Sequence, residues 1–162
     1  GEVLPRRLNQ LSLPCWQLPA FGSDENLPAL IGKAALAGAA AAGLQPGSST
    51  LLLAAHGSQV SPASRLATLR LKELLSGMLP FRAIVAGFIE EAPFLPETAR
   101  GLGAALCLPL FTLNAGHVLN DVPEALLEAG FEGPLLEHIG AHPDVPGMIA
   151  GALERHSAAA LA

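Results

Sequence analysis

The side chains best suited to bind a metal ion or to move a proton are histidines. Of the five in the chain, four follow apolar runs of the sequence: His56, His117, His138 and His142. A neutral imidazole is a common ligand of divalent transition metals, and with an unperturbed pKa of about 6.5 it also accepts protons near neutral pH. The spacing therefore points to metal-ion or proton-transfer chemistry.

Carboxylates follow one further apolar run, at Glu90 and Glu91. Imidazole together with carboxylate is a frequent ligand set for divalent metals, so His56, His117 and an acidic residue form the candidate group. Each residue also has an ordinary explanation. A single histidine at a strand end can hydrogen-bond its own loop, and the two glutamates can be solvated turn residues. Asp121 is better explained as a helix cap than as a ligand, and for His138 and His142 both interpretations stay open.

Ser58 is the one alternative nucleophile beside these residues. The GxSxG elbow of serine hydrolases does not surround it, so Gly57 and Ser58 are better interpreted as a tight turn that exposes His56. The chain also has neither a Walker A sequence nor a GxGxxG fingerprint, and we expect no nucleotide partner.

The elements that must position these residues alternate between strand and helix. Continuous apolar runs, typical of strands covered on both faces, occur at 50–55, 81–88, 105–111 and 135–139. Helical patterns separate them at 61–78, with Ser61 as N-cap and Pro62 as first residue, then at 93–101 and 121–130, and a last helix opens at 144–146. This order predicts an α/β fold of three layers, a doubly wound, parallel, four-stranded sheet. Ligands of such sheets bind beyond the carboxyl ends of the strands, where the candidate residues fall.

A run of turn formers at 45–49 divides the chain into an N-terminal extension or linker, 1–47, and an α/β domain, 48–162. The extension contains an Ala-rich stretch that predicts a helix from Asp24 to Gly43. Because the chain begins with Gly1 rather than Met, we expect it to be either a trimmed chain or one domain of a longer protein.

The composition of the chain bears on which classes of partner it can have. The 162 residues are 51% hydrophobic and 14% charged, with a formal net charge of −5, which argues against a nucleic-acid surface. The longest apolar stretch consists mostly of Ala and Gly, so we expect no membrane span. Cys15 and Cys107 form no CxxC pair and are expected to be buried free thiols in the cytoplasm.

The chain resembles the sirohydrochlorin chelatases of the CbiX type across about residues 48–160. The matching segments are 51–58 (LLLAAHGS), 87–90 (GFIE) with Pro93 following, 108–123 (LPLFTLNAGHVLNDVP) and, more weakly, 140–143 (GAHP).

The resemblance implies ATP-independent insertion of a divalent metal, Co²⁺ first and Fe²⁺ or Ni²⁺ as alternatives, into a tetrapyrrole of cobalamin or siroheme biosynthesis. It implies His56 and His117 as the metal-handling and proton-accepting residues, with Glu90 as an assisting carboxylate. It also implies a second chelatase-like lobe, supplied by homodimerisation or fusion. The family often has a basic residue where this chain has Gln59. The alternative function is a non-catalytic lobe that binds tetrapyrrole or metal within a larger protein.

Overall fold

The computed structural model describes residues 18–113 and 120–160, with side chains as far as 157. In chain order the elements are η1 (Phe21–Ser23), α2 (Leu27–Ala41), η2 (Pro46–Ser48), β1 (Thr50–Ala55), α3 (Ala63–Met78), β2 (Ala83–Phe88), α4 (Leu95–Ala99), β3 (Ala105–Pro109), α5 (Val122–Glu128), η4 (Ile139–Ala141) and α6 (Val145–Ala160). Strands and helices alternate from β1 to α5, as the sequence predicts.

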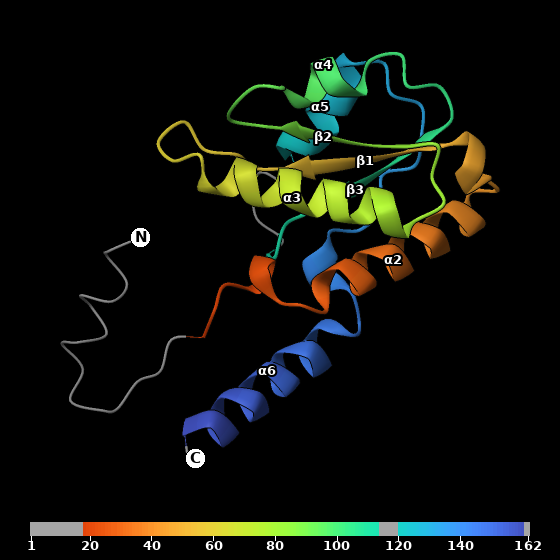
Figure 1. Cartoon of the computed structure of the whole chain (residues 1–162). Coiled ribbons are helices and arrows are strands. Elements are labelled where there is room, and N and C mark those ends of the chain that lie inside the picture. Colours follow the sequence, from red (N-terminus) through yellow and green to blue (C-terminus); the bar gives the residue numbers. More distant parts are fainter. Residues whose placement is uncertain (1–17, 114–119, 161–162) are drawn as a thin grey trace.

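The sheet of the described residues has three parallel strands in the order β2-β1-β3 (Figure 1). Thr50, at the start of β1, pairs with Ala83 on one side and Ala105 on the other. All six residues of β1 are buried, which explains why the central strand is a continuous apolar run rather than an alternating one.

The predicted fourth strand, 135–139, is wrong. Leu135 makes only an isolated parallel bridge with Cys107. Cys107 N–H donates to the Pro134 carbonyl at 2.9 Å, and Leu136 N–H donates to the Cys107 carbonyl at 2.8 Å. Pro134 has no N–H to extend this ladder, and the chain soon turns into η4. The three-layer α/β architecture with parallel strands is nevertheless confirmed.

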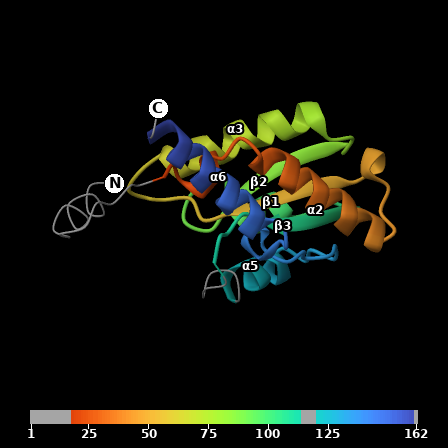
Figure 2. The ribbon, with the colours of Figure 1, turned by 90° about the horizontal axis from the view of Figure 1, so that it is seen from below.

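Helices cover both faces of the sheet. Leu51 and Leu53 of β1 point into the core shared with α2 and α3, whereas Leu52 and Ala54 point into the core shared with α4 and α5. Figure 2, turned to look from below, shows α2 and α3 on the near side of the strands. The two-residue alternation of β1 therefore divides one apolar run between two cores.

The Ala-rich helix α2, which the sequence assigns to the N-terminal extension, is part of the main core. Leu27, Ile31, Ala35 and Ala39 are buried along its length. Gly38 of the same helix allows the Leu136 side chain to pack close to the α2 backbone, since a Cβ on Gly38 would come within 2.6 Å of that side chain.

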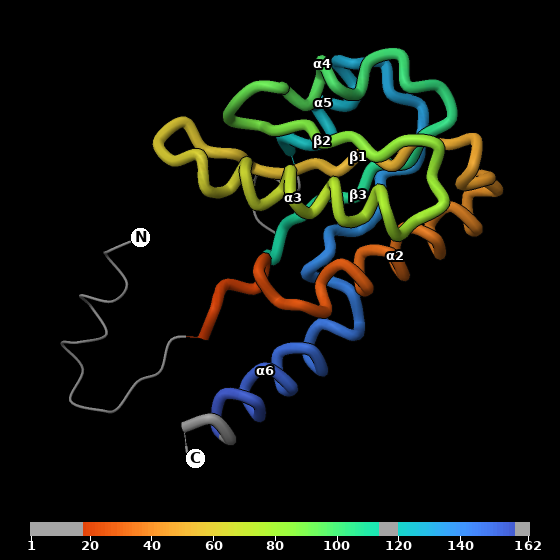
Figure 3. Tube along the Cα trace, in the orientation of Figure 1, coloured from red at the N-terminus to blue at the C-terminus, as the bar shows by residue number. Residues whose placement is uncertain are grey.

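The last helix, α6, points away from the sheet, as the trace in Figure 3 makes clear. Its first turn is anchored to the core of α2 and α3 by Val145 and Met148. Across residues 18–113 and 120–160, no helix has the length and apolar character needed to cross a membrane.

Three predicted helix starts differ from the structure. α2 begins at Leu27 with Asn26, not Asp24, as its N-cap, and α4 begins at Leu95 rather than at 93. Pro62 is the N-cap of α3 and the helix begins at Ala63, one residue later than predicted. Asp121 is the N-cap of α5, as predicted, but its carboxylate makes no capping hydrogen bond to that helix.

Candidate functional site

The carboxyl ends of the strands bring the first two candidate segments together. Beyond the end of β1 and β2, Ile89 N–H donates to the Ala55 carbonyl at 3.1 Å and Glu90 N–H donates to the His56 carbonyl at 2.9 Å. The loops after β1 and β2 lie next to each other at the left of Figure 1. Two residues 34 positions apart, His56 and Glu90, are thus fixed side by side through their backbones.

The His56 ring is half-buried at this edge. Its Nδ1 lies 3.1 Å from the Gly57 carbonyl oxygen. Because a carbonyl only accepts, this contact puts the proton of a neutral ring on Nδ1 and the acceptor lone pair on Nε2. Phe111, which follows β3, meets the ring edge-on, with centroids 6.4 Å apart and planes at 62°. This tautomer suits a base or a metal ligand.

The two glutamates have different surroundings. Glu90 is half-exposed, and its Oε2 accepts a hydrogen bond from Gln59 Nε2 at 3.3 Å. Glu91 is only 17% exposed, and its two oxygens contact Ser58 N–H and the Arg65 guanidinium. Of the pair, Glu90 is joined to His56 through its backbone N–H, while its carboxylate contacts Gln59.

Ser58 forms the tight turn that the sequence predicts. Its Oγ accepts hydrogen bonds from Val60 N–H at 3.3 Å and Ser61 N–H at 3.2 Å. A serine that holds its own loop in this way is a common turn device.

His117 lies outside the described residues, so its pairing with His56 stays a prediction. In the described part of the chain, no group of three or more His, Cys, Asp or Glu residues could hold a metal ion. His56 and Glu90 are therefore two candidate ligands of a set that would need at least one more.

The other two candidate histidines, His138 and His142, make their hydrogen bonds away from His56 and Glu90. His138 is 8% exposed, and its Nδ1 lies 3.0 Å from the Phe111 carbonyl oxygen. His142 Nδ1 accepts a hydrogen bond from Asp144 N–H at 3.2 Å. Both line a pocket of about 240 Å³ against α2. His138 thus supports the loop that carries Phe111, and the structure gives His142 a local role in its own turn.

Two groups near these elements have displaced pKa values. Burial raises the pKa of the Cys107 thiol to about 12, so this cysteine stays protonated in the core and is unsuited to bind a metal. The hydrogen bond from Lys33 lowers the pKa of the Asp144 carboxyl below its ordinary value of 3.8. The expectation of a buried free thiol is confirmed for Cys107, whereas Cys15 lies outside the described residues.

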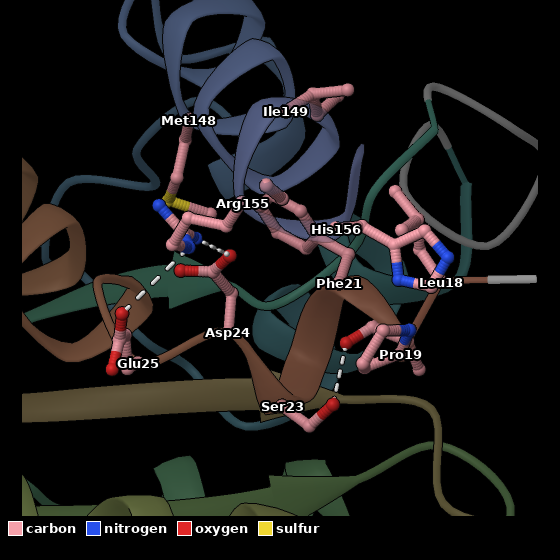
Figure 4. Close-up of a pocket in the computed structure, with 12 residues that line it drawn as sticks. Leu18, Pro19, Phe21, Ser23, Asp24, Glu25, Met148, Ile149, Arg155 and His156 are labelled. Carbon is pink, nitrogen blue, oxygen red and sulfur yellow. Dashed lines mark hydrogen bonds and ion pairs between the residues drawn. The ribbon is translucent and has the colours of Figure 1, made fainter. Parts of the chain in front are cut away.

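A larger pocket, of about 550 Å³, lies away from the strand ends, between η1 and α6 (Figure 4). Arg155 of α6 closes one side, with its Nη2 3.3 Å from Asp24 Oδ2 and its Nε 3.9 Å from Glu25 Oε1. Sequence reasoning missed this pocket, because its two walls are more than 120 positions apart and neither follows a strand.

Comparison with known proteins identifies the family. Residues 50–156 match the family model for CbiX. The chain is also similar to the solved structure of CbiX described as the terminal enzyme for biosynthesis of siroheme in denitrifying bacteria. The two share 44% sequence identity over 94% of this chain and 67% of that chain, with a TM-score of 0.87. The chain belongs to the CbiX family. The predicted resemblance is thus confirmed, and the protein is a metal chelatase.

More distant structures share the fold. A CbiX protein of Marinobacter aquaeolei is 20% identical over 67% of this chain and 96% of that one, with a TM-score of 0.54. The sirohydrochlorin chelatase SirB of Bacillus subtilis, solved with cobalt, is 16% identical over 94% of this chain and 59% of that one, with a TM-score of 0.58. No curated protein sequence matches the chain.

Proposed function

We propose that this CbiX-family chain inserts a divalent metal into a sirohydrochlorin-type tetrapyrrole in the cytoplasm, without ATP. The observation that carries the proposal is the backbone hydrogen bond from Glu90 N–H to the His56 carbonyl, which holds the two residues together at the carboxyl edge of the sheet. Its support from relatives is the 44% identical CbiX, an enzyme of siroheme biosynthesis.

In this proposal His56 and Glu90 handle the metal ion and the protons that it displaces. Metal insertion requires an aqua ion to lose part of its water shell and the macrocycle to lose its inner N–H protons. A neutral His56 ring with its lone pair on Nε2 can bind the ion or accept a proton, and a carboxylate beside it stabilises positive charge. His117 is proposed as the second imidazole of the site.

Two exposed apolar side chains suit a flat macrocycle. Val60 is 96% exposed in the loop after β1, and Leu113 is 74% exposed in the loop after β3. Large apolar side chains at a loop tip gain stability when a ligand covers them. We propose that they contact the face of the tetrapyrrole.

Co²⁺ is the metal that we propose first, with Fe²⁺ and Ni²⁺ as alternatives, since imidazole and carboxylate bind all three. SirB has been solved with cobalt and also with Fe³⁺, which keeps the alternatives open. The product would feed cobalamin or siroheme biosynthesis.

A second chelatase-like lobe is proposed to complete the site, supplied by a second copy or by fusion. The chain spans about two thirds of the 44% identical CbiX. Such a lobe would close over the edge that carries His56 and supply the remaining contacts to the macrocycle.

The test mixes the purified chain with sirohydrochlorin and each metal in turn and follows the macrocycle absorbance. We expect insertion well above the protein-free rate, fastest with Co²⁺. If two copies assemble, the rate per chain should also rise with protein concentration. Rates equal to the protein-free control for all three metals, with the dimer demonstrated by light scattering, would reject the function.

A further inference from the structure

The Glu91 carboxylate is held from two sides. Its Oε1 accepts the Ser58 backbone N–H at 2.8 Å, and its Oε2 lies 3.0 Å from Arg65 Nε. Glu91 follows β2, Ser58 follows β1, and Arg65 belongs to α3. One side chain therefore joins three separate elements, through hydrogen bonds that charge makes stronger than neutral ones.

The same carboxylate packs against the backbone of the residue after His56. Gly57 is buried and has a positive φ of 75°. A Cβ on Gly57 would lie 2.9 Å from Glu91 Cγ and 3.1 Å from Phe88 Cβ. The Gly57–Ser58 turn thus rests directly on Glu91, with no room for a side chain between them.

The direction in which the His56 ring points depends on this turn. The His56 Nδ1 contact is made to the Gly57 carbonyl, which belongs to the peptide linking Gly57 to Ser58. The N–H of that same peptide is the group that Glu91 holds. Glu91 therefore holds the peptide that in turn holds the imidazole. Hydrogen-bond partners of metal ligands commonly orient those ligands in the same way.

We infer that Glu91 is a positioning residue for His56: it holds the Gly57–Ser58 peptide, and through it the tautomer and orientation of the His56 ring. The neighbouring Glu90 contacts a different group, Gln59, and is not part of this link. The inference rests on the proposed role of His56 in metal insertion, but the contact itself can be tested without turnover.

The experiment compares Glu91→Ala and Glu91→Gln in the full chain, with Glu73→Ala as the control. Glu73 is an exposed glutamate of α3 that pairs with Lys72. The amide oxygen of glutamine can still accept the Ser58 N–H, whereas alanine cannot. Three readouts are taken: kcat and KM for metal insertion, the melting temperature, and the NMR resonance of the His56 ring C–H, assigned by its loss in His56→Ala.

For Glu91→Ala we expect a kcat lower by roughly 10- to 100-fold with a far smaller change in KM, since small displacements of a reacting group have effects of this size. Its His56 resonance should shift. Glu91→Gln should recover part of the kcat and of the original resonance, because its one amide oxygen can accept the Ser58 N–H but cannot also accept from Arg65. Should Glu91→Ala fail to fold, Arg65→Ala replaces it, with a smaller change in the same direction.

A wild-type kcat and an unshifted His56 resonance in folded Glu91→Ala would overturn the inference. So would a Glu91→Gln variant that is as inactive as Glu91→Ala with the His56 resonance unmoved, because the charge itself would then act on the substrate. If the wild-type protein inserts no metal, the proposed function fails, and the resonance shift alone still decides whether Glu91 positions His56.

Discussion

Replacing Gly57 with alanine is expected to destabilise the protein and to disturb the turn that orients His56. The backbone φ of 75° is left-handed, and for a residue with a Cβ this conformation costs about 1–2 kcal/mol. The new Cβ would also lie 2.9 Å from Glu91 Cγ and 3.0 Å from Glu91 Oε1. Overpacking of this kind typically adds about 1–3 kcal/mol.

The matched control is Gly101→Ala. Gly101 has a nearly equal φ of 71°, but nothing lies within 4 Å of its added Cβ. It therefore measures the backbone cost alone, and the difference between the two variants measures the crowding against Glu91. With about 2–4 °C of melting temperature per kcal/mol, Gly57→Ala should melt roughly 2–12 °C below Gly101→Ala.

The assays are thermal melting and urea unfolding, both followed by circular dichroism, with the free energy of unfolding extrapolated to zero denaturant. The double variant Gly57→Ala/Glu91→Ala should recover part of the difference, since it removes the Cγ and Oε1 atoms that the new Cβ meets. Equal free energies for Gly57→Ala and Gly101→Ala would refute the described packing of the turn on Glu91.

Three further predictions concern the core and the surface. In a Cys15→Ala background, Cys107 should react with a thiol reagent at pH 8 only after unfolding, because burial raises its pKa to about 12; rapid labelling of the native protein would contradict its burial. Leu52→Ala should lower the free energy of unfolding in urea by about 2–5 kcal/mol, because this fully buried side chain leaves a cavity. Folding lowers the pKa of Asp144 below its ordinary value of 3.8, so the ion pair with Lys33 should stabilise the protein at neutral pH. This stabilisation should weaken as the pH falls below 3.8 and should be lost once the pH is below the folded-state pKa. Thermal melting of wild type and Asp144→Asn across this range checks it, and a stability difference that grows on acidification would contradict it.

The sequence was sufficient to predict the sheet edge that carries His56. The run Thr50–Ala55 is apolar at every position, and the structure buries all of it between two helical layers. A polar residue directly after such a strand must emerge at the carboxyl edge. Continuing the β1–β2 register, in which Ala55 pairs with Phe88, sets Ile89 opposite His56, and the Glu90 N–H bonds the His56 carbonyl one residue further on.

The roles of Glu90 and Glu91 could not be separated in the same way. Adjacent acidic residues after a strand look alike in a sequence, and their difference arises from partners elsewhere in the chain. Arg65 lies 26 positions before Glu91 and reaches it only because α3 packs on the sheet. The predicted fourth strand was wrong for a local reason: the apolar run at 135–139 looks like a buried strand, but the proline before it cannot donate to a ladder.

Long-range packing also decided two other features. α2 belongs to the main core, although the turn formers at 45–49 separate it from β1 in the sequence. The pocket between η1 and α6 depends on Arg155 reaching Asp24, 131 positions earlier. Contacts of this kind leave no periodic signal in a sequence.

The most direct test of the central claim is the rate of Co²⁺ insertion into sirohydrochlorin by His56→Ala, with His142→Ala as the control histidine. We predict that His56→Ala falls to the protein-free rate while it keeps its circular dichroism spectrum, and that His142→Ala retains most of the wild-type rate. A folded His56→Ala variant that inserts cobalt as fast as the wild-type protein would contradict the account.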